Sequence, residues 1–194
     1  MKQRGQSLGE AMCVIALVAM FAAITVPAFI SMNRRKAVQA VADELRGVFR
    51  SMRAQAIARS RNVGVRFARN GAEWQYAMYD DGDGDGIRSD DIRRNVDPLI
   101  AGPVRLASHQ RIAKIALPPE PIVDPDGDDL EPDDEPVQFN RSTICSFSPL
   151  GAATPGSIYL TDGGGSVWCL RVYGATARIR LLRYDARRKK WEAK

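Results

Sequence analysis

The fold of this 194-residue chain is decided by residues 11–32, which read AMCVIALVAMFAAITVPAFISM and contain no charged side chain. A helix of 22 residues measures about 33 Å, which is enough to cross the ~30 Å apolar core of a bilayer. A secretory signal peptide has an apolar region of only ~7–15 residues. The length therefore favours a transmembrane helix, and a buried core helix of a soluble domain is the alternative.

The residues that precede the apolar run contain a carboxylate in an unusual place. Residues 1–5 form a short basic leader, and Glu10 lies at the very edge of the run. A carboxylate there costs ~2 kcal/mol or more unless it is paired. Cleavage after Gly5 would create an amine on Gln6, which shares a helix face with Glu10. The new amine could neutralise Glu10 in the same subunit or in a neighbour, which gives a physical reason for a cut at Gly5.

The stretch G-Q-S-L-G-E at residues 5–10, followed by the apolar run, resembles the class III signal of type IV prepilins and secretion pseudopilins. The resemblance implies that a prepilin peptidase cuts after Gly5 and methylates Gln6. It also implies that Glu10 sets the register against a neighbouring subunit and that Pro27 kinks the helix during assembly. Gln6 stands where these families usually have Phe, and Gly9 where they have Ile or Val.

The charges that flank the span give a conflicting signal about topology. Lys2 and Arg4 precede the span, whereas Arg34, Arg35 and Lys36 follow it directly. Charge counting alone would place the C-terminal side in the cytoplasm. The resemblance implies a single-pass protein of the inner membrane, with a cytoplasmic leader and a periplasmic head. We follow the resemblance because it also accounts for the cleavage site.

A second helical pattern continues beyond the span. Apolar residues recur at spacings of 3, 4, 3 and 4, at Val38, Val41, Leu45, Val48 and Met52. This periodicity predicts an amphipathic helix that runs on to about residue 60 and packs one face beneath a sheet. A simple membrane tether is the alternative. The segment 48–65, VFRSMRAQAIARSRNVGV, resembles the GspH/FimT group of minor pilins and pseudopilins.

The remainder of the chain is rich in short strand-like runs bounded by Gly, Asp and Pro. Six strands are predicted, at Asn62–Ala68, Glu73–Tyr79, Arg111–Leu117, Ser157–Thr161, Ser166–Tyr173 and Ala177–Tyr184. The sequence therefore predicts an α+β, pilin-like protein, with a long N-terminal helix packed on a mainly antiparallel sheet. Its expected parts are a leader (1–5), a transmembrane segment (6–32), an amphipathic helix (33–61) and a β-rich head (62–194) with an acidic, mobile loop at 117–136.

Three aspartates form the best candidate for a metal site. Asp81, Asp83 and Asp85 alternate with glycines as D-G-D-G-D-G, which matches the start of a calcium loop. The twelfth position is Ile92 rather than the usual Glu, so Asp90 or Asp91 would have to supply the last ligand in a shortened loop. The pattern predicts either a calcium site or an acidic, solvated loop between strands.

Two of the three cysteines lie beyond the membrane span. A disulfide between Cys145 and Cys169 would close a loop of about 25 residues on the oxidising side of the membrane. The sequence predicts this bond, and two reduced thiols buried in the sheet are the alternative. Cys13 lies within the span and is interpreted as a small apolar residue.

Charge is distributed unevenly, although the net charge is only +5. Residues 120–136 contain nine acids and no base, and residues 171–194 contain nine bases and two acids. Arg178 and Arg180 alternate on a predicted strand and therefore share a face. They could bind nucleic-acid phosphates, as in some FimT-like minor pilins, or they could pair with the acids of the chain.

The sequence offers little for catalysis. There is a single histidine, His109, and no phosphate-binding loop, dinucleotide-binding glycine pattern or nucleophile elbow. We therefore predict a non-enzymatic protein. The resemblance implies a minor pseudopilin of a type II protein secretion system, which assembles with other pilin-like subunits at a short filament tip. One alternative is a type IV pilus minor pilin that handles DNA, and a second is an unprocessed, single-span anchored binding domain.

Overall fold

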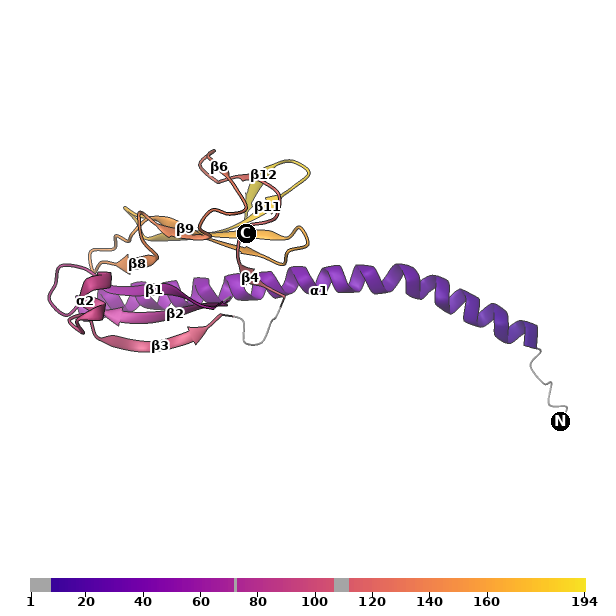
Figure 1. Ribbon diagram of the computed structural model, residues 1–194, viewed down its shortest axis with the longest axis horizontal. Helices are drawn as coiled ribbons and strands as arrows, with labels where there is room; N and C mark the ends of the chain where they lie inside the picture. The colour runs from indigo at the N-terminus through magenta and orange to yellow at the C-terminus, as the bar shows by residue number, and fades with distance from the viewer. Residues whose placement is uncertain (1–7, 72, 107–111) are drawn as a thin grey trace.

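A computed structural model describes residues 8–71, 73–106 and 112–194, and the first element is one long helix. Helix α1 (Leu8–Arg59) has 52 residues and therefore a length of about 78 Å. It continues through Pro27 without a break, and its N-terminal half curves away from the rest (Figure 1). All strands gather around its C-terminal half, so the molecule consists of a head and a protruding helix, as predicted.

The C-terminal half of α1 forms the centre of the head. Val38, Val41, Leu45 and Met52 are buried as predicted, whereas Val48 is only partly buried. Phe49, which the predicted stripe did not include, is also fully buried. Its ring centroid lies 5.7–6.1 Å from three other aromatic rings, those of Phe67, Phe139 and Phe147. These rings come from three different strands, so Phe49 ties the helix to both larger sheets.

The head contains two larger antiparallel sheets and one hairpin. The first sheet has the order β3-β2-β1-β8, with bounds β1 (Val63–Asn70), β2 (Glu73–Asp80), β3 (Leu99–Arg105) and β8 (Ile144–Phe147). The second has the order β12-β11-β10-β9-β4, and β7 also pairs with β9. Its bounds are β4 (Lys114–Ile115), β7 (Val137–Phe139), β9 (Gly156–Thr161), β10 (Val167–Tyr173), β11 (Arg178–Asp185) and β12 (Lys190–Ala193). The short helix α2 (Ser89–Arg93) links β2 to β3 at the end of the head farthest from the N-terminus (Figure 1).

The acidic segment 117–136 contains secondary structure that the sequence analysis did not predict. Strands β5 (Ile122–Val123) and β6 (Asp129–Leu130) pair as a small hairpin. Two side chains of the second sheet fasten it. The Trp191 indole donates a hydrogen bond to the carbonyl oxygen of Val123 at 2.7 Å, and Arg171 pairs with Asp124 at 3.7 Å. The hairpin therefore covers a second apolar cluster, formed by Leu117, Tyr159, Cys169 and Leu182.

The predicted disulfide between Cys145 and Cys169 is wrong for this structure, because both cysteines are free and buried thiols. Cys145 belongs to the main core around α1, whereas Cys169 belongs to the second cluster. The neighbours of Cys169 on β10, Trp168 and Leu170, face the main core. Because side chains alternate along a strand, Cys169 points to the opposite face of the sheet from the main core. Burial raises the pKa of both thiols, that of Cys169 to about 12.

Candidate functional site

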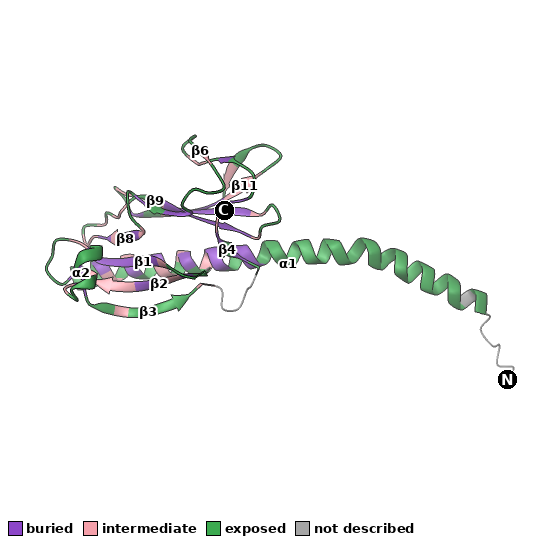
Figure 2. Cartoon of the chain, viewed as in Figure 1, coloured by how far each residue is buried: buried purple, intermediate pink, exposed green. Residues whose placement is uncertain are grey.

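The N-terminal half of α1 is an apolar surface that the head does not cover. Its most apolar stretch of 18 residues has a mean hydropathy of 2.6, and none of it is buried. Figure 2 shows the described residues of this half as exposed, whereas one side of the C-terminal half is buried in the head. The exposed large side chains include Ile15, Phe21, Ile24 and Phe29. An apolar surface of this size and length requires a bilayer or other apolar helices around it.

The structure describes only some of the residues that the sequence analysis singled out in this half. Gly5 and Gln6 lie outside the described residues. Glu10 lies in the first turns of α1, where the structure describes its backbone. Pro27 lies within the exposed half of the helix. Cleavage, methylation and pairing of Glu10 therefore stay predictions.

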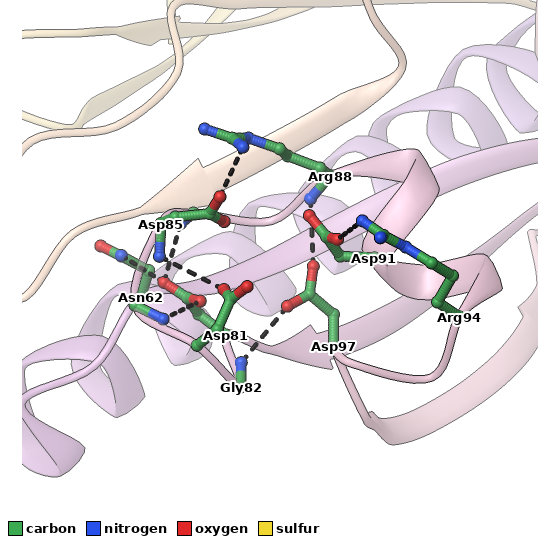
Figure 3. A network of polar contacts seen from close by, with 11 residues as sticks. Asn62, Asp81, Gly82, Asp85, Arg88, Asp91, Arg94 and Asp97 are labelled. Atoms are coloured by element: carbon green, nitrogen blue, oxygen red, sulfur yellow. Dashed lines mark hydrogen bonds and ion pairs between the residues drawn. The ribbon is translucent and has the colours of Figure 1, made fainter.

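Asp81 is the central residue of a hydrogen-bonded loop at the other end of the molecule, beside α2 (Figure 3). The residue is almost fully buried, with 2% of its surface exposed. It accepts hydrogen bonds from Asn62 Nδ2 at 2.6 Å and from the backbone N–H groups of Gly84 and Gly86 at 2.8 and 3.0 Å. Burial raises the pKa of this carboxyl, but the hydrogen bonds outweigh that effect, and the pKa lies below its usual value.

A second buried aspartate closes the same loop. Asp97, at 1% exposure, accepts hydrogen bonds from the backbone N–H groups of Gly82 at 3.2 Å and Arg88 at 3.1 Å. Position 82 requires glycine, because a Cβ there would lie 1.9 Å from the carbonyl oxygen of Val96. The sequence analysis did not single out Asp97. It lies 16 residues after Asp81, and no motif links the two positions.

The loop brings together the three aspartates that were predicted to bind calcium. Carboxylate oxygens of Asp81, Asp83 and Asp85 lie within 4.8 Å of one another. Such a spacing suits oxygen ligands around one cation. The acids proposed to complete the shell do not join them: Asp90 pairs with Arg93, and Asp91 pairs with Arg94 at 2.6 Å. Asp81 already accepts three hydrogen bonds, so it holds the loop in place without a cation, and calcium binding stays a prediction.

The basic C-terminal strands are partly neutralised by the chain's own acids. Arg183 pairs with Glu192 at 3.1 Å, and Arg171 pairs with Asp124 and Asp126 of the acidic hairpin segment. Arg178 and Arg180 form no ion pair within the described part of the chain. Arg180 instead lies over the ring of Tyr173, with 5.8 Å between the guanidinium carbon and the ring centroid. Ion pairs within the described residues therefore neutralise Arg171 and Arg183, whereas Arg178 and Arg180 at one end of β11 remain for a phosphate. The single histidine, His109, lies outside the described residues.

A long helix that is apolar and exposed over one half and packed in an antiparallel β head over the other defines a pilin-like α+β protein. A comparison with protein families matches residues 41–176 to the family described as Type II transport protein GspH. The match spans more than half of the chain, and the chain belongs to this family. The match begins within α1 and covers most of the head, so it does not include the prepilin-like signal at residues 5–10, which stays a prediction. Comparisons with curated proteins and with solved structures give no match.

Proposed function

We propose that the chain is a minor pseudopilin of a type II protein secretion system and that its role is assembly rather than catalysis. The observation that carries the proposal is the division of α1 into two halves. The first is uncovered, apolar and of bilayer length, and the second is built into the core of the head. Membership of the GspH family connects such a chain to type II transport and to other pilin-like subunits.

The proposed route begins in the inner membrane, where the apolar half of α1 anchors the chain with its head in the periplasm. A prepilin peptidase removes residues 1–5 and methylates Gln6. The Glu10 carboxylate then lies at the edge of an apolar environment, where an unpaired charge is costly. Pairing with the N-terminal amine of a neighbouring subunit removes that cost and sets the axial position of one helix against the next. The heads then stack at the tip of a short filament.

Processing is tested by the mass of the N-terminal peptide after expression with a prepilin peptidase. The wild-type chain should begin at Gln6 and carry an added methyl group, whereas Gly5→Leu should retain residues 1–5. Gly9→Ala changes another glycine of the same segment and serves as the control that remains processed. A wild-type chain that keeps its leader and lacks the methyl group would favour the unprocessed anchored domain instead.

The role of Glu10 is tested separately from processing. Glu10→Ala should be cut at Gly5 as usual but should no longer co-purify with pilin-like partners from gently solubilised membranes. The reason is that the variant has no carboxylate for the neighbour's amine. Normal recovery of these partners with the Glu10→Ala variant would refute the pairing.

A type IV pilus minor pilin that handles DNA is the second candidate, and the unpaired Arg178 and Arg180 favour it. Under this alternative, duplex DNA should bind the chain with an affinity that falls steeply as salt rises. Arg178→Gln with Arg180→Gln should weaken that binding, whereas Arg183→Gln, which removes an arginine already paired with Glu192, should change it less. Recovery of secretion pseudopilins rather than pilus subunits with the tagged chain would decide for the first candidate.

A further inference from the structure

A small hollow lies where the protruding helix enters the head. One wall is formed by α1 and the other by the loop between β9 and β10. The hollow has a volume of about 320 Å³. Its lining residues are Pro27, Ile30, Ser31, Arg34 and Arg35 from the helix, with Asp162, Gly164 and Ser166 from the loop.

The hollow spans the boundary between apolar and charged sequence. Pro27 and Ile30 belong to the uncharged run 11–32, and Arg34, Arg35 and Lys36 follow that run within four residues. When α1 crosses a bilayer, the end of the apolar run lies at the level of the lipid headgroups. The hollow therefore has an apolar end within the hydrocarbon region and a basic end among the headgroups.

The cations at this boundary are available to a ligand. Arg34, Arg35 and Lys36 are exposed, and none forms an ion pair with any residue that the structure describes. The carboxylate in the lining, Asp162, is already engaged, because its Oδ1 accepts hydrogen bonds from the N–H groups of Gly164 at 2.8 Å and Ser166 at 3.0 Å.

The guanidinium of Arg34 lies over the loop. A Cβ placed on Gly164 would be 3.4 Å from Arg34 Nη1 and 3.6 Å from Asp162 Oδ1. Glycine at this position therefore leaves open the space beside the guanidinium. Two arginines and one engaged carboxylate leave the lining with a net positive charge, which suits an anion.

We propose that this hollow binds the headgroup phosphate of an anionic phospholipid from the leaflet on the head side. Arg34 and Arg35 hold the phosphate oxygens, the Ser166 hydroxyl donates to one of them, and Pro27 and Ile30 contact the first carbons of the lipid. This inference rests on the proposed function, because it requires α1 to span the membrane. It also gives a physical reason for the three cations on the head side, which oppose the charge rule for topology, since anionic headgroups attract basic residues beside a span.

The test uses the full chain reconstituted in vesicles with equal amounts of phosphatidylglycerol and phosphatidylcholine. Native mass spectrometry then counts the lipids that the released protein retains. The wild type should retain phosphatidylglycerol over phosphatidylcholine by on the order of tenfold or more, given two arginines at the headgroup level. Arg34→Gln with Arg35→Gln should abolish this preference. Arg178→Gln with Arg180→Gln removes the same charge from strand β11, beside the end of β10 that is farthest from the hollow, and this variant should keep the preference.

A second variant separates a shaped site from a diffuse positive field. Gly164→Leu fills the hollow without changing its charge, and it should reduce the preference several-fold while circular dichroism shows an unchanged fold. The proposed site would be refuted if Gly164→Leu or the double arginine variant kept the wild-type preference for phosphatidylglycerol. Full displacement of the lipid by excess inorganic phosphate would also refute it. Incorporation of the chain into vesicles of pure phosphatidylcholine tests whether the apolar half of α1 anchors it in a membrane at all. A chain that fails to incorporate would contradict the proposed function, independently of the lipid site.

Discussion

Replacing Phe49 with alanine tests whether the two halves of α1 have different roles. The Phe49 side chain has no exposed surface and touches the aromatic rings of three strands. Truncation of a buried phenylalanine costs about 3–5 kcal/mol, because burial is lost and a cavity remains. A domain of this size has a free energy of unfolding of about 5–15 kcal/mol, so the variant loses a large part of its stability.

The assay is urea unfolding of the full chain in mild detergent, followed by tryptophan fluorescence. Trp74 and Trp168 are buried in the main core and report on the head. For a urea dependence of about 2 kcal/mol per molar, a loss of ~4 kcal/mol lowers the midpoint by about 2 M. Phe21→Ala is the matched control, because Phe21 lies on the same helix with 70% of its surface exposed. Its free energy of unfolding should stay within about 0.5 kcal/mol of the wild-type value. Equal shifts in the two variants would refute the division of the helix.

Three further predictions follow from the head. Gly82→Ala should lower the unfolding midpoint, since its Cβ would meet the Val96 carbonyl oxygen at 1.9 Å; Gly47→Ala, whose Cβ meets nothing within 4 Å, should raise it slightly. Cys145 and Cys169 should resist alkylation in the folded chain and should react after unfolding without reductant. An intact mass that is two hydrogens lower than expected for three free thiols would show that the disulfide forms after all. The folded pKa of Asp81 is lowered, so its charge stabilises the head above pH ~4, and this contribution is lost as the pH falls through the folded pKa. The urea midpoint should therefore fall on acidification, and by less in Asp81→Asn; an equal fall in both proteins would contradict this role.

The long helix and most of the longer strands could be predicted because their patterns are strong. An uncharged run of bilayer length indicates a transmembrane helix, and apolar residues at spacings of three and four indicate an amphipathic helix. The difference between Val48 and Phe49 has a physical cause. The prediction assumed one sheet, but α1 contacts both larger sheets and buries a wider arc, which also includes Ala42 and Ala56.

The missed strands lack the signals that periodicity needs. Strand β3 is an edge strand with mostly exposed residues and an internal Gly-Pro pair, so it shows no alternation. Strands β7 and β8 have only three and four residues. The disulfide was mispredicted because the distance between two cysteines in the sequence does not tell which face of a sheet each occupies.

The candidate sites depended even more on tertiary structure. The alternating aspartates at 81–85 could be found by motif, but the partner of this loop, Asp97, could not. The hollow beside Arg34 combines residues of α1 with a loop about 130 residues further along the chain. No local sequence pattern relates these two segments, because the distance between them depends on how strands β9 and β10 pack against the helix.

The burial of half of α1 inside the head has a mechanical consequence. A force that draws the head away from the membrane acts along the helix axis, and the helix contacts β1, β8, β9, β10 and β11. These contacts lie along the direction of pulling, so they are loaded together in shear rather than opened one after another. Because a close-packed interior has low compressibility and transmits strain, the helix and the head move as one body, and a displacement of the head is passed on to the protruding half of the helix.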